Sequence, residues 1–86
     1  MRVEYSKTAV KALMRMDRSL RNRIREAIMG LTQTPPIGDI KPMAGKPAGR
    51  YRLRVGGYRV IYRYDQNGTM IVLHVIDVGP RGDIYK

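Results

Sequence analysis

The sequence predicts an α+β protein in which a helical hairpin packs on one face of a small, twisted, mainly antiparallel sheet, with the element order β-α-α-β-β-β. Apolar residues recur at intervals of three and four near the N-terminus, as in amphipathic helices. The C-terminal half instead alternates between apolar and polar residues, and is interrupted by Gly-Gly and Asn-Gly pairs typical of hairpin turns. A chain of 86 residues supports one domain, spanning residues 1–86, with one modest core.

The first predicted elements are a short strand and a helix. Val3 and Tyr5 lie on one face of a strand over Arg2–Tyr5, because side chains alternate along a strand. Ser6 is a favoured N-cap for the element that follows, since its hydroxyl can accept a bond from a free backbone N–H. The apolar residues within Thr8–Met16 follow helical spacing, which predicts a first amphipathic helix.

A second helix and a long loop follow. Asp17 can cap this helix, whose apolar stripe consists of Leu20, Ile24, Ala27, Ile28 and Leu31. Pro35-Pro36 stops it, because a proline ring clashes with the preceding turn and removes a hydrogen-bond donor. The segment Pro35–Gly49 is rich in proline and glycine and is therefore predicted to be a loop, which Ile40 and Met43 attach to the core.

Two alternating runs that meet at Gly56-Gly57 predict a β-hairpin, because both glycines can adopt the positive φ of a tight turn. The first strand runs from Arg50 to Val55 and the second from Tyr58 to Tyr64. One face of the first strand carries Arg50, Arg52 and Arg54, and one face of the second carries Arg59, Ile61 and Arg63. Arginines on one face repel each other, so either solvent relaxes the repulsion or an anion binds there.

The last predicted strand follows a turn at Asp65–Gly68, where Asn-Gly is a strong hairpin signal. Its residues, Thr69–Val78, are apolar at both parities, with Ile71, Leu73 and Val75 on one face and Met70, Val72, Ile76 and Val78 on the other. A strand that is apolar on both faces belongs in the interior of a sheet. Gly79–Gly82 ends the strand and leaves only a short tail.

Charge is the most distinctive global property of the chain. Seventeen Lys and Arg residues oppose seven acids, which gives a net charge of +10, and twelve of the seventeen are arginine. This excess favours a polyanionic partner, either nucleic acid or an acidic protein, over a merely solvated surface. The chain has no cysteine, no signal-like N-terminus and no apolar run long enough for a membrane span. We therefore expect a soluble, cytoplasmic protein with no membrane contact.

The sequence offers few residues for conventional catalysis. His74, the only histidine, lies within an apolar strand, and a structural role is favoured over a catalytic one. The carboxylates lack the spacing of a metal site, so we expect neither a metal nor a cofactor. A phosphate could instead be surrounded by Arg52, Arg54, Arg59 and Arg81, with Tyr85 stacking on a nucleobase. On chemistry alone, cleaving RNA through its 2′-hydroxyl and merely binding a phosphate backbone remain equally open.

Two motifs resemble a known family. The run Tyr51–Tyr62, with its Tyr-Arg-Val-Ile-Tyr segment, resembles the central motif of RelE-type toxins in the RelE/ParE toxin–antitoxin superfamily. The segment Val78–Tyr85 resembles the closing arginine-to-tyrosine motif of that family, and this ending points to the RelE branch. The turn at Met43-Ala44-Gly45 and the early helix pair also fit, so the resemblance covers the whole chain and implies a RelE-like fold.

The resemblance implies a ribosome-dependent mRNA endonuclease, or mRNA interferase, that cuts the codon in the decoding site through the 2′-hydroxyl. Arg52 and Arg54 match basic positions where relatives often have lysine, and Arg59 matches the arginine that stabilises the phosphate. Arg81 matches the arginine that acts on the leaving group, and Tyr85 matches the tyrosine that stacks on a base. Relatives often carry His or Lys just before that arginine, where this chain has proline.

The resemblance also implies partners and leaves two alternatives. A cognate RelB-like antitoxin would block the site, ribosome and mRNA would be the targets, and operator DNA would be bound only through the antitoxin complex. One alternative is a ParE-like inhibitor of DNA gyrase on the same scaffold. The other is a degenerate toxin that only binds its antitoxin or RNA.

Overall fold

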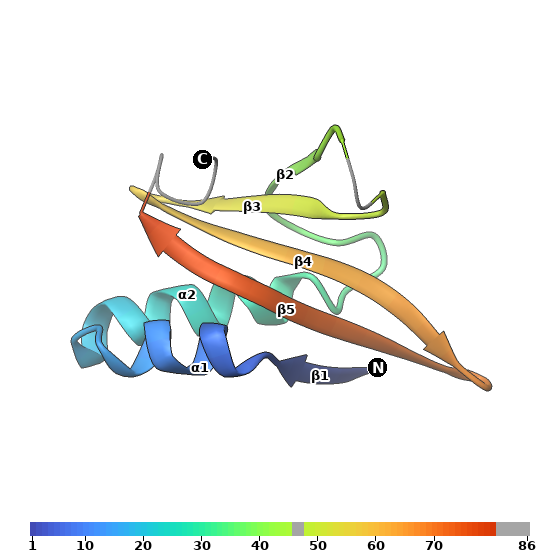
Figure 1. Cartoon of the computed structure of the whole chain (residues 1–86), viewed down its shortest axis with the longest axis horizontal. Coiled ribbons are helices and arrows are strands. Elements are labelled where there is room, and N and C mark those ends of the chain that lie inside the picture. Colours follow the sequence, from blue (N-terminus) through green and yellow to red (C-terminus); the bar gives the residue numbers. More distant parts are fainter. Residues whose placement is uncertain (46–47, 81–86) are drawn as a thin grey trace.

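The computed structural model describes residues 1–45 and 48–80, and it confirms the α+β class and the helical hairpin packed on a sheet (Figure 1). The sheet has five strands in the order β1-β5-β4-β3-β2; β1 pairs with β5 in parallel and the other pairs are antiparallel. The elements are β1 (Arg2–Tyr5), α1 (Lys7–Met14), α2 (Arg18–Gly30), β2 (Asp39–Pro42), β3 (Tyr51–Val55), β4 (Tyr58–Asn67) and β5 (Met70–Pro80).

Both predicted helix caps are present. The Ser6 hydroxyl accepts a hydrogen bond from the backbone N–H of Ala9 at 3.0 Å, and the Asp17 carboxylate accepts one from Leu20 at 2.8 Å. The first helix ends at Met14, two residues earlier than predicted. It ends there because the next two backbone N–H groups bond to carbonyls three residues back, which tightens the chain into the turn before the second cap.

Ser6 also ties this helix to the sheet, which makes it a sensitive position for stability. Its hydroxyl donates to the backbone carbonyl of Ile76 at 2.6 Å while it caps Ala9. Ser6→Ala breaks both bonds, and we expect it to cost about 1–3 kcal/mol of unfolding free energy. Asp17→Ala removes a single exposed bond and should cost less. Chemical denaturation of both variants measures the difference, and equal losses would contradict this role for Ser6.

The prediction of an unbroken loop over Pro35–Gly49 is wrong, because β2 lies inside it and pairs with β3. Ile40 packs against the core as expected, whereas Met43 lines a surface cavity. Sequence patterning missed β2 because proline and glycine surround it. Pro42 is tolerated at its end because β2 is an edge strand, where a missing N–H breaks no ladder.

The second hairpin is longer than predicted. Strand β4 continues to Asn67, so the predicted turn at Asp65–Gly68 shifts to Gly68-Thr69. Asp65 and Gln66 pair with residues of β5 instead of forming the turn. As predicted for an apolar strand, β5 has neighbours on both sides, β1 and β4. The predicted end of the last strand at Gly79–Gly82 lies partly outside the described residues, and β5 extends to Pro80, two residues beyond the predicted Val78.

An irregularity in the β4–β5 ladder changes which side chains of β5 face the helices. Ile61 pairs with Asp77 while Tyr62 pairs with Val75, so Ile76 is an extra residue in β5. Simple alternation predicts that Val78 shares a face with Ile76. The bulge instead moves Val78 into the core beside Val75.

The core fills the space between the helices and one face of the sheet (Figure 1). Its buried residues are Ala9, Leu13, Ile24, Ile28, Leu31, Leu53, Val60, Tyr62, Leu73, Val75 and Val78. Neither described helix is long and apolar enough to cross a membrane.

Three tyrosines of the hairpin contact one another on this inner face. Tyr51 stacks on Tyr62 with ring centroids 5.5 Å apart, and the Tyr64 hydroxyl donates to the Leu31 carbonyl at 2.8 Å. Burial raises the pKa of Tyr62 above its usual range, and the neighbouring Tyr64 and Tyr51 raise it further. Burial, followed by Tyr51, likewise raises the pKa of Tyr64. The phenols of Tyr62 and Tyr64 therefore stay protonated and pack as part of the protein interior.

Candidate functional site

The candidate site lies on the opposite, outer face of the sheet, where the hairpin arginines gather. In the strand register, Arg54 lies between Asp39 of β2 and Arg59 of β4. Arg52 lies in the next row, between Lys41 and Ile61. Side chains directly opposite each other in a sheet point to the same face, so three adjacent strands bring four cations together with one carboxylate.

A cavity of about 390 Å³ lies over these rows. Its lining consists of Lys41, Pro42, Met43, Ala44, Arg52, Arg54 and Arg59. Strand β2 and the turn after it form one wall, and the arginines of the hairpin form the other. Because the charged side chains of the lining come from paired strands, their positions are fixed by the sheet and not by loops.

Arg52 is the most deeply buried cation of this group, with only 7% of its surface exposed. Its Nη2 lies 3.7 Å from the Asp39 carboxylate, which is itself largely exposed. Within residues 1–45 and 48–80, Arg52 Nη1 and Arg54 Nε are buried without a hydrogen-bond partner. A buried guanidinium N–H that lacks an acceptor is costly, and a phosphate oxygen is an acceptor that suits its planar geometry. The cavity therefore suits an oxyanion.

The lining is better suited to binding negative charge than to accepting a proton. Guanidinium groups keep their protons, so these arginines can bind and stabilise negative charge but cannot accept a proton. Lys41 is the one cation among the described lining residues that is not an arginine, and it carries a compact ammonium in place of a planar guanidinium. No group of three or more metal-ligating side chains occurs in the described part of the chain.

The structure brings together three of the five site residues predicted from sequence, namely Arg52, Arg54 and Arg59. Arg81 and Tyr85 lie outside the described residues. Sequence analysis missed Lys41 and Asp39, because both belong to the unpredicted strand β2. Their charge was visible in the sequence, but only the pairing of β2 with β3 places them beside the hairpin arginines.

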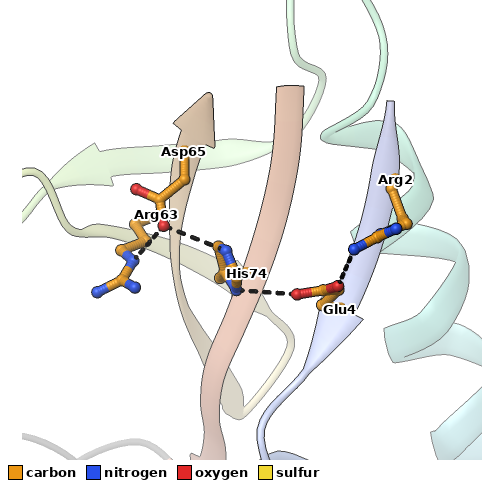
Figure 2. A network of polar contacts seen from close by, with 5 residues as sticks. All are labelled: Arg2, Glu4, Arg63, Asp65 and His74. Carbon is orange, nitrogen blue, oxygen red and sulfur yellow. Dashed lines mark hydrogen bonds and ion pairs between the residues drawn. The ribbon is translucent and has the colours of Figure 1, made fainter. Parts of the chain in front are cut away.

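His74 is half-buried and lies in a chain of polar contacts on the same face of the sheet (Figure 2). Its Nε2 lies 3.1 Å from the Asp65 carboxylate and its Nδ1 lies 3.6 Å from Glu4. The two carboxylates are also bound by Arg63 and Arg2, at 3.1 and 2.6 Å. This geometry agrees with the structural role expected for His74, because it links β1, β5 and β4 side by side.

Comparison with known protein sequences matches this chain to toxins. Residues 3–85 match the family model described as the ParE toxin of the type II toxin–antitoxin system, parDE. The chain is 30% identical over 84 residues to toxin RelG of Mycobacterium tuberculosis. The match covers 98% of this chain and 94% of that protein.

Solved structures of toxins are also similar to this chain. The archaeal RelE–RelB complex from Pyrococcus horikoshii contains a chain 31% identical to this one, with a TM-score of 0.69 over 95% of this chain and 96% of that one. A YoeB/ParE toxin from Agrobacterium tumefaciens, at 23% identity, shares the fold with a TM-score of 0.79 over 94% of this chain and 99% of the other.

Proposed function

We propose that this chain, which belongs to the ParE toxin family of type II toxin–antitoxin systems, is a ribosome-dependent mRNA endonuclease of the RelE kind. The observation that carries the proposal is the cavity lined by Arg52, Arg54 and Arg59, in which Arg52 is buried with an N–H lacking an acceptor. A phosphodiester group of RNA satisfies that N–H and neutralises the repulsion among the arginines.

In the proposed reaction the 2′-oxygen of the substrate attacks the adjacent phosphorus. The bond from phosphorus to the 5′-oxygen breaks, the 2′-hydroxyl loses its proton to an acceptor and the leaving oxygen gains one. The products are a 2′,3′-cyclic phosphate and a 5′-hydroxyl. No metal or cofactor is part of this scheme, so the protein supplies orientation and electrostatic stabilisation.

Each arginine has a separate role in the proposal. Arg52 and Arg54, on β3, hold the phosphate, and Arg59, on β4, stabilises the charge that grows on its oxygens in the transition state. Arg81 acts on the leaving oxygen, and Tyr85 stacks on a base to fix the codon; both roles come from the resemblance of the C-terminal motif.

The proposal includes partners. A cognate RelB-type antitoxin binds this toxin in the cytoplasm and blocks the arginine cavity, and operator DNA is contacted only through the antitoxin complex. Support comes from the related chain in the archaeal RelE–RelB complex. When the antitoxin is lost, the toxin reaches its targets, the ribosome and its mRNA.

The 2′-hydroxyl route predicts sensitivity to one substrate atom. An mRNA with a single 2′-deoxynucleotide at the cleaved position should resist cleavage on the ribosome, because the attacking oxygen is absent. The unmodified message should yield a fragment ending in a 2′,3′-cyclic phosphate, identified by mass spectrometry. Efficient cleavage of the 2′-deoxy message would rule this mechanism out.

Inhibition of DNA gyrase is the second candidate function, because the matching family model is that of ParE toxins. The cavity favours the nuclease, since a transition state with growing phosphate charge uses clustered arginines that gyrase binding does not require. A supercoiling assay with purified gyrase separates the two functions. A degenerate toxin, which binds only antitoxin or RNA, would fail both that assay and the cleavage assay.

A further inference from the structure

A second cavity, of about 270 Å³, lies on the same outer face of the sheet. Its polar lining is provided by Arg50, Arg63, His74, Glu4 and Ser6. These residues come from separate parts of the chain, and the register explains why they meet. Arg63 pairs with His74, and His74 pairs with Glu4. Arg50 directly precedes Tyr51, which pairs with Tyr62, the neighbour of Arg63. A row of side chains across β1, β5 and β4, continued by the residue just before β3, therefore lines this cavity.

The acids near this cavity are already neutralised. Asp65 uses one carboxylate oxygen, Oδ2, to bind both Arg63 Nε and His74 Nε2 (Figure 2). Glu4 is bound by Arg2 and faces His74. The contact with Asp65 engages Arg63 through Nε alone, and so leaves its two terminal amino groups for a ligand. The network therefore places an arginine beside the cavity without leaving an uncompensated carboxylate there.

Arg50 adds positive charge that no acid in the described part of the chain balances. Its Nε is buried and has no hydrogen-bond partner within residues 1–45 and 48–80, and none of the ion pairs found there involves it. As with Arg52, such a buried N–H is costly until an acceptor arrives. A cavity with one unsatisfied guanidinium N–H and a second guanidinium at its side suits an oxyanion.

The spacing of Arg50 and Arg52, one beside each cavity, matches a single-stranded nucleic acid. Arg50 and Arg52 lie two residues apart on one face, which corresponds to about 6.6 Å along a strand. The phosphates of an extended RNA strand are separated by one sugar-phosphate unit of similar length. We propose that the second cavity binds the phosphate next to the scissile one, so that the RNA backbone runs from Arg52 of β3 to Arg50, just before that strand. This inference rests on the proposed function, because the first cavity must hold RNA.

Phosphate is favoured over an acidic peptide as the occupant. A peptide carboxylate would also satisfy Arg50, but nothing in a peptide requires two anions at this spacing, whereas RNA repeats its phosphate at each nucleotide. The proposal therefore predicts that Arg50 contributes to affinity only when the RNA is long enough to carry a second phosphate.

The test compares two 2′-O-methyl oligonucleotides, which cannot be cleaved because the attacking oxygen is blocked. A dinucleotide carries one phosphate and a trinucleotide carries two. Fluorescence anisotropy at low salt should show that the wild-type protein binds the trinucleotide about tenfold more tightly. The slope of log affinity against log salt should steepen by about 0.7 for the added phosphate. Arg50→Gln should abolish both gains and leave dinucleotide affinity unchanged.

Arg18→Gln is the matched control, because it removes the same charge from an exposed position on α2. It should keep the full gain, and thermal denaturation of both variants checks that each is folded. Arg63→Gln should reduce the gain to an intermediate value. An unchanged gain in Arg50→Gln, or no gain in the wild type, overturns the proposal. If the variant instead loses affinity only for a cognate antitoxin peptide, the occupant is an acidic peptide and the proposal is also overturned.

The second phosphate site and the proposed function can each be refuted without refuting the other. A length-dependent gain that requires Arg50, found in a protein that does not cleave mRNA on ribosomes, would keep the second phosphate site and refute the nuclease. Cleavage on ribosomes with no such gain would keep the nuclease and refute the second site.

Discussion

Replacing Arg59 by alanine is expected to reduce mRNA cleavage on the ribosome by about 10²–10³-fold, the usual cost of removing one donor that stabilises a transition-state oxyanion. Arg59 lines the arginine cavity directly opposite Arg54, and it lies on β4, the middle strand of the sheet. An arginine on so rigid an element is positioned before the reaction begins. Its charge interacts most strongly when phosphate charge is greatest, so the loss should fall on the rate and much less on ribosome affinity.

Two further variants test whether the loss of rate is specific to the guanidinium of Arg59. Arg59→Lys keeps the charge but loses the planar fork of donors, and it should recover only part of the rate. Arg18→Ala removes an equal charge from an exposed position of α2 and should leave the cleavage rate of bound ribosomes unchanged. Single-turnover cleavage separates the rate from binding. Equal losses in Arg59→Ala and Arg18→Ala would show that only net charge matters, and would remove Arg59 from the proposed site.

Replacing Arg81 by alanine should have an effect of similar size. Arg81 lies outside the described residues, and its assignment to the leaving oxygen comes from the C-terminal motif. Loss of a group that assists proton transfer or charge at a leaving oxygen costs about 10²–10⁴-fold in rate. Ribosome binding should change little, because the interaction is made mainly in the transition state. Tyr85→Ala should also reduce cleavage, since a misoriented base moves the attacking oxygen out of line.

Growth after induction gives a direct readout for these two positions. Cells that express the parent toxin should stop growing, and cells that express Arg81→Ala or Tyr85→Ala at equal protein level should continue. Toxicity of both variants equal to that of the parent would show that the two site assignments are wrong, whatever the wild-type mechanism is.

Local sequence patterns predicted the parts of this fold that depend on local interactions. Ser6 and Asp17 cap helices because a short side-chain acceptor reaches backbone N–H groups within the first turn. Gly56-Gly57 makes the first hairpin, and alternation along its strands correctly placed Arg52, Arg54 and Arg59 together on one face. The arginine half of the candidate site was therefore predictable, since a two-residue period fixes the face to which each side chain points.

The remaining features depend on partners distant in the sequence. Strand β2 exists because it pairs with β3, and its own residues, rich in turn formers at each end, gave no strand signal. The bulge at Ile76 reverses the face of Val78, and no local rule located it. The burial of Arg52 and its contact with Asp39 follow from the same unpredicted pairing. Lys41 was missed as a lining residue for this reason as well.

The most direct test of the central proposal is toeprinting of an mRNA on purified translating ribosomes, with the same mRNA free in solution as the control. We predict a new 3′ end within the codon in the decoding site, no cleavage of the free message and no effect of the toxin on gyrase supercoiling. An intact message on stalled and elongating ribosomes, together with inhibited supercoiling, would contradict the nuclease and assign the protein to gyrase inhibition.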